Sequence, residues 1–134
     1  MTTATESIVI EQFIRKPPAR VWAALTSPEE IARWWAPGDI KPVVGHKFTL
    51  DMGSWGQQPC EILEAVEPER LVYSFTPDWT LTWKLVPEAG GTRLVFEHSG
   101  FDLSNPQQRF AFENMGSGWK KILPHFAGLL EKED

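Results

Sequence analysis

His98 is the titratable residue of this sequence with the best position for chemistry. It occupies alternate positions with Leu94 and Phe96, so a strand over residues 92–98 would turn all three side chains inward. An imidazole titrates near neutral pH, where it can bind an acidic ligand or act as a general base. Only Tyr73 is available as a polar helper, however. We therefore favour a structural role, in which His98 ends the strand and bonds to a neighbouring loop.

Aromatic side chains are the second candidate, because seven tryptophans and eight phenylalanines exceed what an ordinary core of this size needs. Trp35, Trp55 and Trp79 stand close to proline or glycine in expected turns. In such places they either rim a pocket mouth or form a surface for a partner.

We therefore predict a ligand site that is built from these aromatic residues and their inward neighbours. Phe48, Phe96 and Trp119 also fit an ordinary packed core. The predicted ligand-binding set is Trp35, Phe48, Leu50, Trp55, Tyr73, Trp79, Trp83, Phe96, His98, Phe112, Met115 and Trp119.

Other kinds of site lack the residues that they require. Asp51 and Glu97 point outward by alternation, which argues against a paired-carboxylate acid–base site. The lone Cys60 fits a small packed residue better than a nucleophile. Metal-ligand spacing, a P-loop, a dinucleotide fingerprint and a nucleophile elbow are all missing. We expect no metal, no cofactor and no catalytic residue.

Length and charge limit the classes of protein. A chain of 134 residues predicts a single domain over residues 1–134. The net charge of -5 argues against nucleic acid as a partner. Neither a secretory signal nor an apolar run of about 20 residues is present, so no membrane insertion is expected. We expect a soluble cytoplasmic protein, either monomer or dimer.

The C-terminal stretch predicts a long amphipathic helix. Trp119, Leu123, Phe126 and Leu130 recur at intervals of three and four residues, and Phe110, Phe112 and Met115 extend the stripe upstream. Such a helix would have about six turns. Pro124 is expected to interrupt or kink it.

The rest of the chain predicts strands and two short helices. Strands are expected at 7–14, 46–52, 58–66, 70–75, 79–85 and 92–98, helices at 19–25 and 28–35, and a loop at 99–106. Hairpin-linked strands form an antiparallel meander with one packed face. The predicted fold is α+β, a curved sheet around a long helix with a pocket between them.

Several motifs in this order give the sequence a family resemblance. They are PARVWAALT at 18–26, IARWWAPG at 31–38, Gly45 with FTLDM at 48–52, EPERLVY at 67–73, GTRL at 91–94, HSGF at 98–101 and GW at 118–119. Together they resemble the START-like superfamily (helix-grip, SRPBCC, Bet v 1-like). Within it they resemble the branch named after the activator of the heat-shock-protein-90 ATPase.

The resemblance implies the helix-grip fold but leaves the activity open. Related domains bind lipids, hormones or polyketides, a few are cyclases or aromatases, and the namesake contacts a chaperone. We rank binding of an apolar, aromatic or lipid-like small molecule first. An enzyme of the cyclase or aromatase kind is one alternative. A protein-binding module that uses the Trp34–Trp35 loop and the acidic end at 131–134 is the other.

Overall fold

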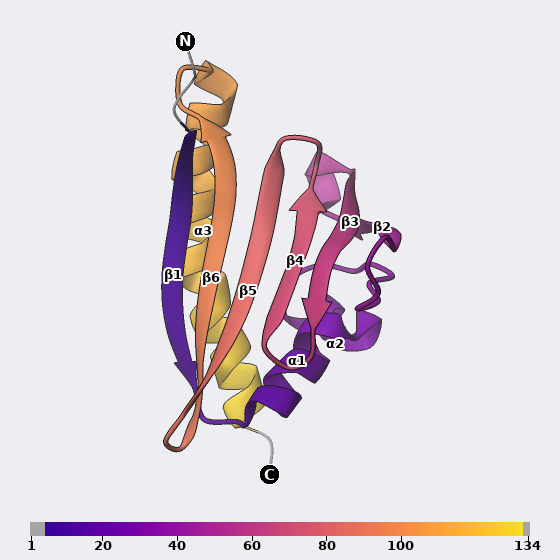
Figure 1. Ribbon diagram of the computed structural model, residues 1–134. Helices are drawn as coiled ribbons and strands as arrows, with labels where there is room; N and C mark the ends of the chain where they lie inside the picture. The colour runs from indigo at the N-terminus through magenta and orange to yellow at the C-terminus, as the bar shows by residue number, and fades with distance from the viewer. Residues whose placement is uncertain (1–4, 133–134) are drawn as a thin grey trace.

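The computed structural model describes residues 5–132, which form a six-stranded antiparallel sheet, two short helices and one long helix (Figure 1). The elements are β1 (Thr5–Ile14), α1 (Pro18–Thr26), α2 (Pro28–Trp34), β2 (Lys47–Asp51), β3 (Gln57–Val66), β4 (Arg70–Phe75), β5 (Trp79–Glu88), β6 (Gly91–Asp102) and α3 (Pro106–Glu131). A short 3₁₀ turn, Gly53–Trp55, lies between β2 and β3. The predicted α+β helix-grip fold is therefore confirmed.

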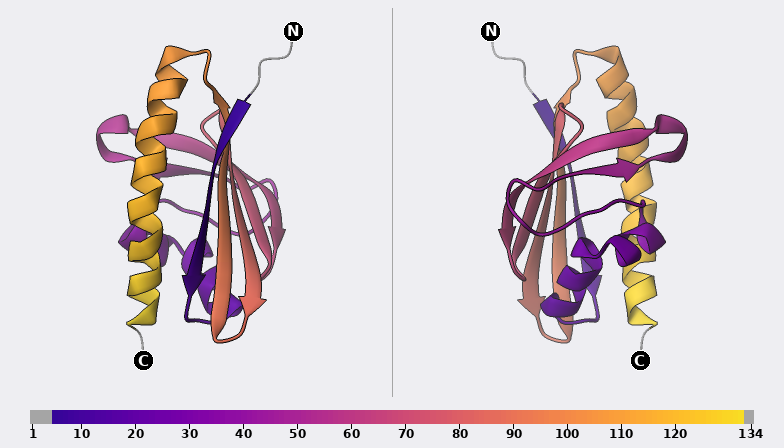
Figure 2. Two further views of the ribbon diagram at one scale, coloured as in Figure 1. Left: turned by 90° about the vertical axis from the view of Figure 1, so that its left-hand side faces the viewer. Right: turned by 90° about the vertical axis from the view of Figure 1, so that its right-hand side faces the viewer.

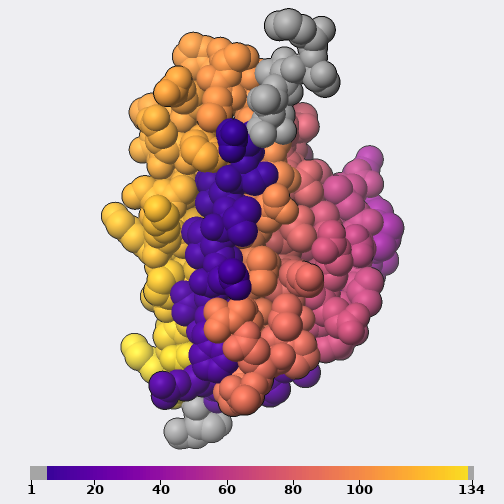
Figure 3. Space-filling view, turned by 60° about the vertical axis from the view of Figure 1, so that its left-hand side comes forward, coloured from indigo at the N-terminus to yellow at the C-terminus, as the bar shows by residue number. Residues whose placement is uncertain are grey.

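The sheet has the strand order β1-β6-β5-β4-β3-β2, so the meander β2 to β6 is extended by β1 at one edge. In the register, Ile8 of β1 and Leu81 of β5 flank His98 of β6. Along β6 the buried residues alternate as Thr92, Leu94, Phe96 and His98, as the period of two predicts. Figure 3 shows β1 as an exposed stripe between α3 and β6.

The prediction that residues 99–102 form a loop is wrong, because β6 continues to Asp102 through a bulge. Its pairing with β1 passes from Ser99 to Phe101, which leaves Gly100 as the extra residue. Gly100 has a positive φ of 99°, and a Cβ there would lie 2.7 Å from the Asp78 carbonyl oxygen. The bulge turns Phe101 inward, where it is fully buried.

Helix α3 starts earlier than its most periodic segment suggested. Asn105 caps it by accepting hydrogen bonds from the backbone N–H groups of Gln107 and Gln108, and Pro106 occupies the first turn. The helix does not end at Pro124, which lies on its exposed face, and continues to Glu131. No helix within residues 5–132 combines the length and apolar character needed to cross a membrane.

The two short helices pack beside the end of the sheet where α3 finishes (Figure 2). Ser27 caps α2, because its hydroxyl accepts from the Glu30 N–H at 3.4 Å. Arg20 of α1 forms an ion pair with Glu30 of α2, which ties the two helices together.

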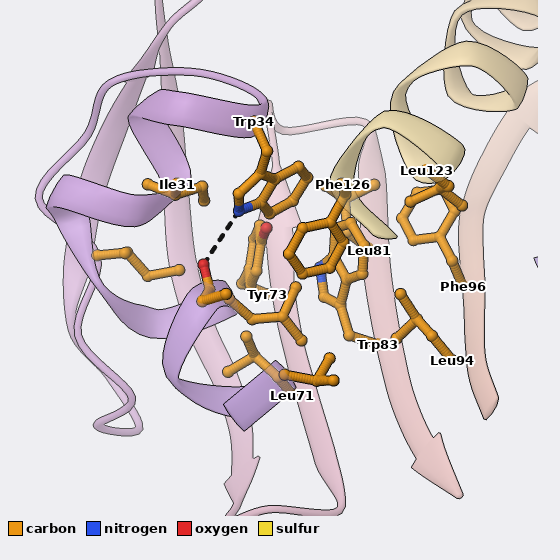
Figure 4. Close-up of a cluster of buried hydrophobic side chains, with 14 of the residues drawn as sticks. Ile31, Trp34, Leu71, Tyr73, Leu81, Trp83, Leu94, Phe96, Leu123 and Phe126 are labelled. Atoms are coloured by element: carbon orange, nitrogen blue, oxygen red, sulfur yellow. Dashed lines mark hydrogen bonds between the residues drawn. The ribbon is translucent and has the colours of Figure 1, made fainter. Parts of the chain in front are cut away.

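Trp34 joins α2 to both the sheet and the second half of α3 (Figure 4). Its ring lies 4.4 Å from that of Phe126 and 5.6 Å from that of Trp83, measured between centroids. Its indole N–H donates to the Ala24 carbonyl at 3.0 Å. The Trp34 side chain therefore connects α2, the sheet and α3.

Replacing Trp34 with alanine should lower the free energy of unfolding by about 3–5 kcal/mol, because a large buried ring and its hydrogen bond are lost together. Urea denaturation at neutral pH measures the change. Trp55→Ala is the matched control, since Trp55 is 75% exposed, and it should stay within about 0.5 kcal/mol of the wild type. Equal effects of the two substitutions would show that Trp34 does not anchor the core.

Candidate functional site: the pocket between the sheet and the first half of helix α3

A pocket of about 1030 Å³ opens between the first half of α3 and the end of the sheet where β5 begins. From α3 it is lined by a stripe that includes Ala111, Met115, Gly118 and Ile122. These positions are three or four residues apart, so they share one face of the helix. This stripe of α3 is thus an apolar surface that faces the pocket.

The pocket exists because α3 packs differently along its length. In its second half, Leu123, Phe126 and Leu130 are buried in the core. In its first half, Gly118 has no side chain to fill the space, and a Cβ added there would meet nothing within 4 Å. The helix is therefore held against the core at one end and leaves room against the sheet at the other.

Aromatic rings form the opposite wall. Trp35 lies 5.6 Å from Phe75 and 4.9 Å from Trp119 between ring centroids. Trp79 continues this layer beside Phe75, at 6.2 Å. The mouth carries two exposed aromatic side chains, Trp55 at 75% exposure and Phe110 at 60%. Aromatic side chains thus line the pocket from the mouth to the inner wall.

Two of the polar lining residues form hydrogen bonds with backbone groups close to them in the sequence. The Gln58 amide donates to the Trp55 carbonyl at 2.6 Å, and the Asn114 amide donates to the Phe110 carbonyl at 2.8 Å. The two amides are therefore engaged in local hydrogen bonds, and Asp78 and Gln107 are open to solvent.

His98 lies directly behind the aromatic wall and is fully buried. The Trp119 indole N–H donates to its Nδ1 at 3.0 Å. Burial lowers the pKa of His98 to about 3, so the imidazole is neutral at physiological pH. The prediction that His98 ends its strand and bonds to a loop is therefore wrong, since β6 continues and the partner is α3.

Two further buried groups have raised pKa values. Burial raises the pKa of the Cys60 thiol to about 12, which agrees with a packed residue and not with a nucleophile. Burial also raises the pKa of the Tyr73 hydroxyl above its usual range. Within residues 5–132, no three His, Cys, Asp or Glu side chains are grouped as metal ligands would be.

The predicted ligand-binding set divides between the pocket and the core. The residues that line the pocket are Trp35, Trp55, Trp79, Met115 and Trp119. Six others, Phe48, Leu50, Tyr73, Trp83, Phe96 and His98, point inward as predicted but are buried in the core. Phe112 packs on Phe101 at 5.2 Å and does not line the pocket. Whether any of these residues binds a ligand stays a prediction.

Several lining residues were not predicted, notably Phe75, Phe110, Gly118 and Ile122. Steps of three and four residues from Met115 lead to Ala111, Gly118 and Ile122, so the helical stripe was the available signal. Phe75 shares its inward face with Leu71 and Tyr73, but alternation does not reveal that it lies nearest the pocket.

The Trp34–Trp35 loop proposed for a protein partner is not an exposed patch. Trp34 is buried and Trp35 is half-buried against Phe75 and Trp119. In the acidic end, the Glu131 carboxylate accepts from the Arg15 backbone N–H at 3.0 Å. Residues 133 and 134 lie outside the described part of the chain.

Known structures share this architecture closely. Protein MLL2253 from Mesorhizobium loti is 33% identical with a TM-score of 0.86, over 96% of this chain and 99% of that one. CalU16 from Micromonospora echinospora is 28% identical with a TM-score of 0.77, over 97% of this chain and 78% of that one. Aha1 from Colwellia psychrerythraea, solved as a dimer, is 16% identical with a TM-score of 0.81 over 95% and 97%, which shows the fold alone.

A family model gives the decisive comparison. No curated protein matches the sequence significantly. The model described as "Activator of Hsp90 ATPase homolog 1-like protein" matches residues 15–131, which is most of the chain and includes α3 and every strand of the sheet except β1. The resemblance seen in the sequence motifs is thereby confirmed, and the chain belongs to the family of Activator of Hsp90 ATPase homolog 1-like proteins.

Proposed function

We propose that the protein binds an apolar, ring-containing small molecule in the pocket between the sheet and the first half of α3. The observation that carries this proposal is the pocket itself, about 1030 Å³ and lined mainly by aromatic and aliphatic side chains. Ligand pockets usually have this size and character, with a few polar groups to orient the ligand. Flat aromatic walls such as Trp35 and Phe75 suit a planar ligand.

The positions and protonation states of the titratable side chains around the pocket favour binding over catalysis. An enzyme of the cyclase or aromatase kind needs polar groups that converge on the substrate and exchange protons near neutral pH. His98 stands behind the wall with its pKa lowered to about 3 by burial, and it is the only buried histidine among residues 5–132. The protein therefore offers its ligand a neutral, shaped environment.

Filling the pocket at Gly118 tests the proposal. Gly118→Leu adds a side chain where nothing lies within 4 Å of the new Cβ, so the fold should tolerate it. Affinity for the neutral fluorescent probe N-phenyl-1-naphthylamine should fall at least tenfold. The thermal midpoint should stay the same or rise, because leucine favours a helix over glycine by about 0.5–1 kcal/mol.

Gly128→Leu is the matched control for this measurement. Gly128 also lies in α3 with nothing within 4 Å of an added Cβ, but it does not line the pocket. It should gain similar helix stability and keep wild-type affinity for the probe. The proposal fails if the wild type does not bind the probe saturably, or if both substitutions weaken binding equally.

The neutral state of His98 predicts a pH dependence of stability. Its pKa is lowered from 6.5 to about 3 by burial, so between these values the unfolded chain binds more protons than the folded one. The stability from the neutral imidazole is complete above pH 6.5 and is lost as the pH falls towards 3, by about 1 kcal/mol per pH unit.

Urea unfolding at pH 7 and pH 5 measures this dependence. The wild type should lose about 1–2 kcal/mol more between these values than His98→Gln does, because the variant has no imidazole to protonate. The other two histidines and all carboxylates are present in both proteins, so their effects cancel in the comparison. Equal losses would show that His98 is not held neutral by burial.

A further inference from the structure

Two buried N–H groups beside the pocket have no hydrogen-bond acceptor among residues 5–132. One is the indole Nε1 of Trp79, and the other is Nε2 of His98. The proton of His98 can be placed from its contacts. An indole N–H can only donate, so Nδ1 of His98 accepts from Trp119, and the proton of the neutral imidazole lies on Nε2. Both unpartnered nitrogens are therefore donors.

The two donors belong to one cluster of rings at the inner wall of the pocket. The rings of Trp79 and His98 lie 5.3 Å apart between centroids, nearly perpendicular at 71°. Phe101 packs on both, at 5.0 Å from Trp79 and 4.5 Å from His98. Phe75 also contacts both rings. The donors are surrounded by apolar rings, and the described part of the chain supplies no acceptor for them.

Unpartnered donors in a buried place cost free energy that an acceptor would recover. Trp79 is the donor nearer to a ligand, because it is half-buried, lines the pocket and begins β5 directly after the Thr76–Asp78 turn. Its nitrogen has almost no exposed surface, so the indole has to shift before a ligand atom can reach it. Both donors are neutral, so the acceptor does not need a charge.

We propose that the inner wall of this pocket receives an acceptor oxygen from the ligand, hydrogen-bonded to Trp79 Nε1, while His98 Nε2 is a further unpartnered donor in the ring cluster behind that wall. The ligand is then a planar, largely apolar molecule that carries a carbonyl or phenolic oxygen, rather than a pure hydrocarbon. The inference rests on the proposed function and deepens it, because it names the polar group that the apolar pocket selects. Trp119 serves as a positioning residue that sets the tautomer of His98.

A pair of isosteric probes tests the inference. 2-Acetylnaphthalene and 2-isopropenylnaphthalene differ in one atom, a carbonyl oxygen in place of a methylene carbon. Competition against N-phenyl-1-naphthylamine gives the affinity of each. The ketone should bind the wild type at least tenfold more tightly, although water solvates its carbonyl better than the alkene.

Trp79→Phe keeps a ring in the wall and removes the donor. It should weaken the ketone about tenfold and change the alkene by less than twofold. Trp55→Phe is the matched control, because Trp55 also lines the pocket but is exposed at its mouth. It should leave the tenfold preference intact.

A second readout needs no substitution. In ¹⁵N-labelled wild-type protein, the ketone should shift the indole N–H resonance of Trp79 downfield, and the alkene should not. Equal binding of the two probes, or a ketone preference that survives Trp79→Phe without a shift at Trp79, would overturn the inference and leave the proposed function standing. Failure of both probes to bind would instead count against the proposed function.

Discussion

The hydrogen bond from Trp119 to His98 joins helix α3 to β6, the strand next to the β1 edge of the sheet, at the boundary between core and pocket. On the C-terminal side of this hydrogen bond, Leu123, Phe126 and Leu130 bury the helix in the core. On its N-terminal side, Gly118 and Met115 face the pocket. An amphipathic helix normally hides its whole apolar stripe. Here only half of the stripe is hidden, and the pocket depends on that division.

The aromatic content of the chain is explained by the same division. Trp83, Tyr73 and Phe96 fill the core with large buried rings. Trp35, Trp79 and Trp119 stand between the core and the pocket, so each contributes to packing on one side and offers a surface on the other. A tryptophan suits this position because it combines a large apolar face with one polar N–H.

Membership of the Activator of Hsp90 ATPase homolog 1-like family accounts for the fold and does not name a ligand. Functions within one fold reside in sites, so the informative features are those of this chain. One hypothesis assigned Trp34 and Trp35 to a protein partner, but Trp34 is buried in the core, where it packs on Trp83 and Phe126. The apolar surface that this structure does present is the pocket and its mouth, where Trp55 and Phe110 are exposed.

The sequence by itself determined the elements and the faces of the strands. Alternation identified the inward residues of β4, β5 and β6, and the stripe through Trp119 and Phe126 identified α3, because periods of two and 3.6 follow from local backbone geometry. One local signal, the bulge at Gly100, was missed, and the strand was therefore predicted too short.

Only the tertiary structure decided which inward residues line the pocket. Alternation assigns a side chain to a face but not to a depth, so Tyr73 and Phe75 share one inward face in the sequence although Tyr73 lies in the core and Phe75 lines the pocket. The partner of His98 lies 21 positions away on another element, beyond any local pattern. The space at Gly118 arises because helix α3 and the sheet, which are distant in the sequence, face each other at a position where glycine has no side chain to fill the gap. Such contacts depend on how elements pack, which local periodicity does not record.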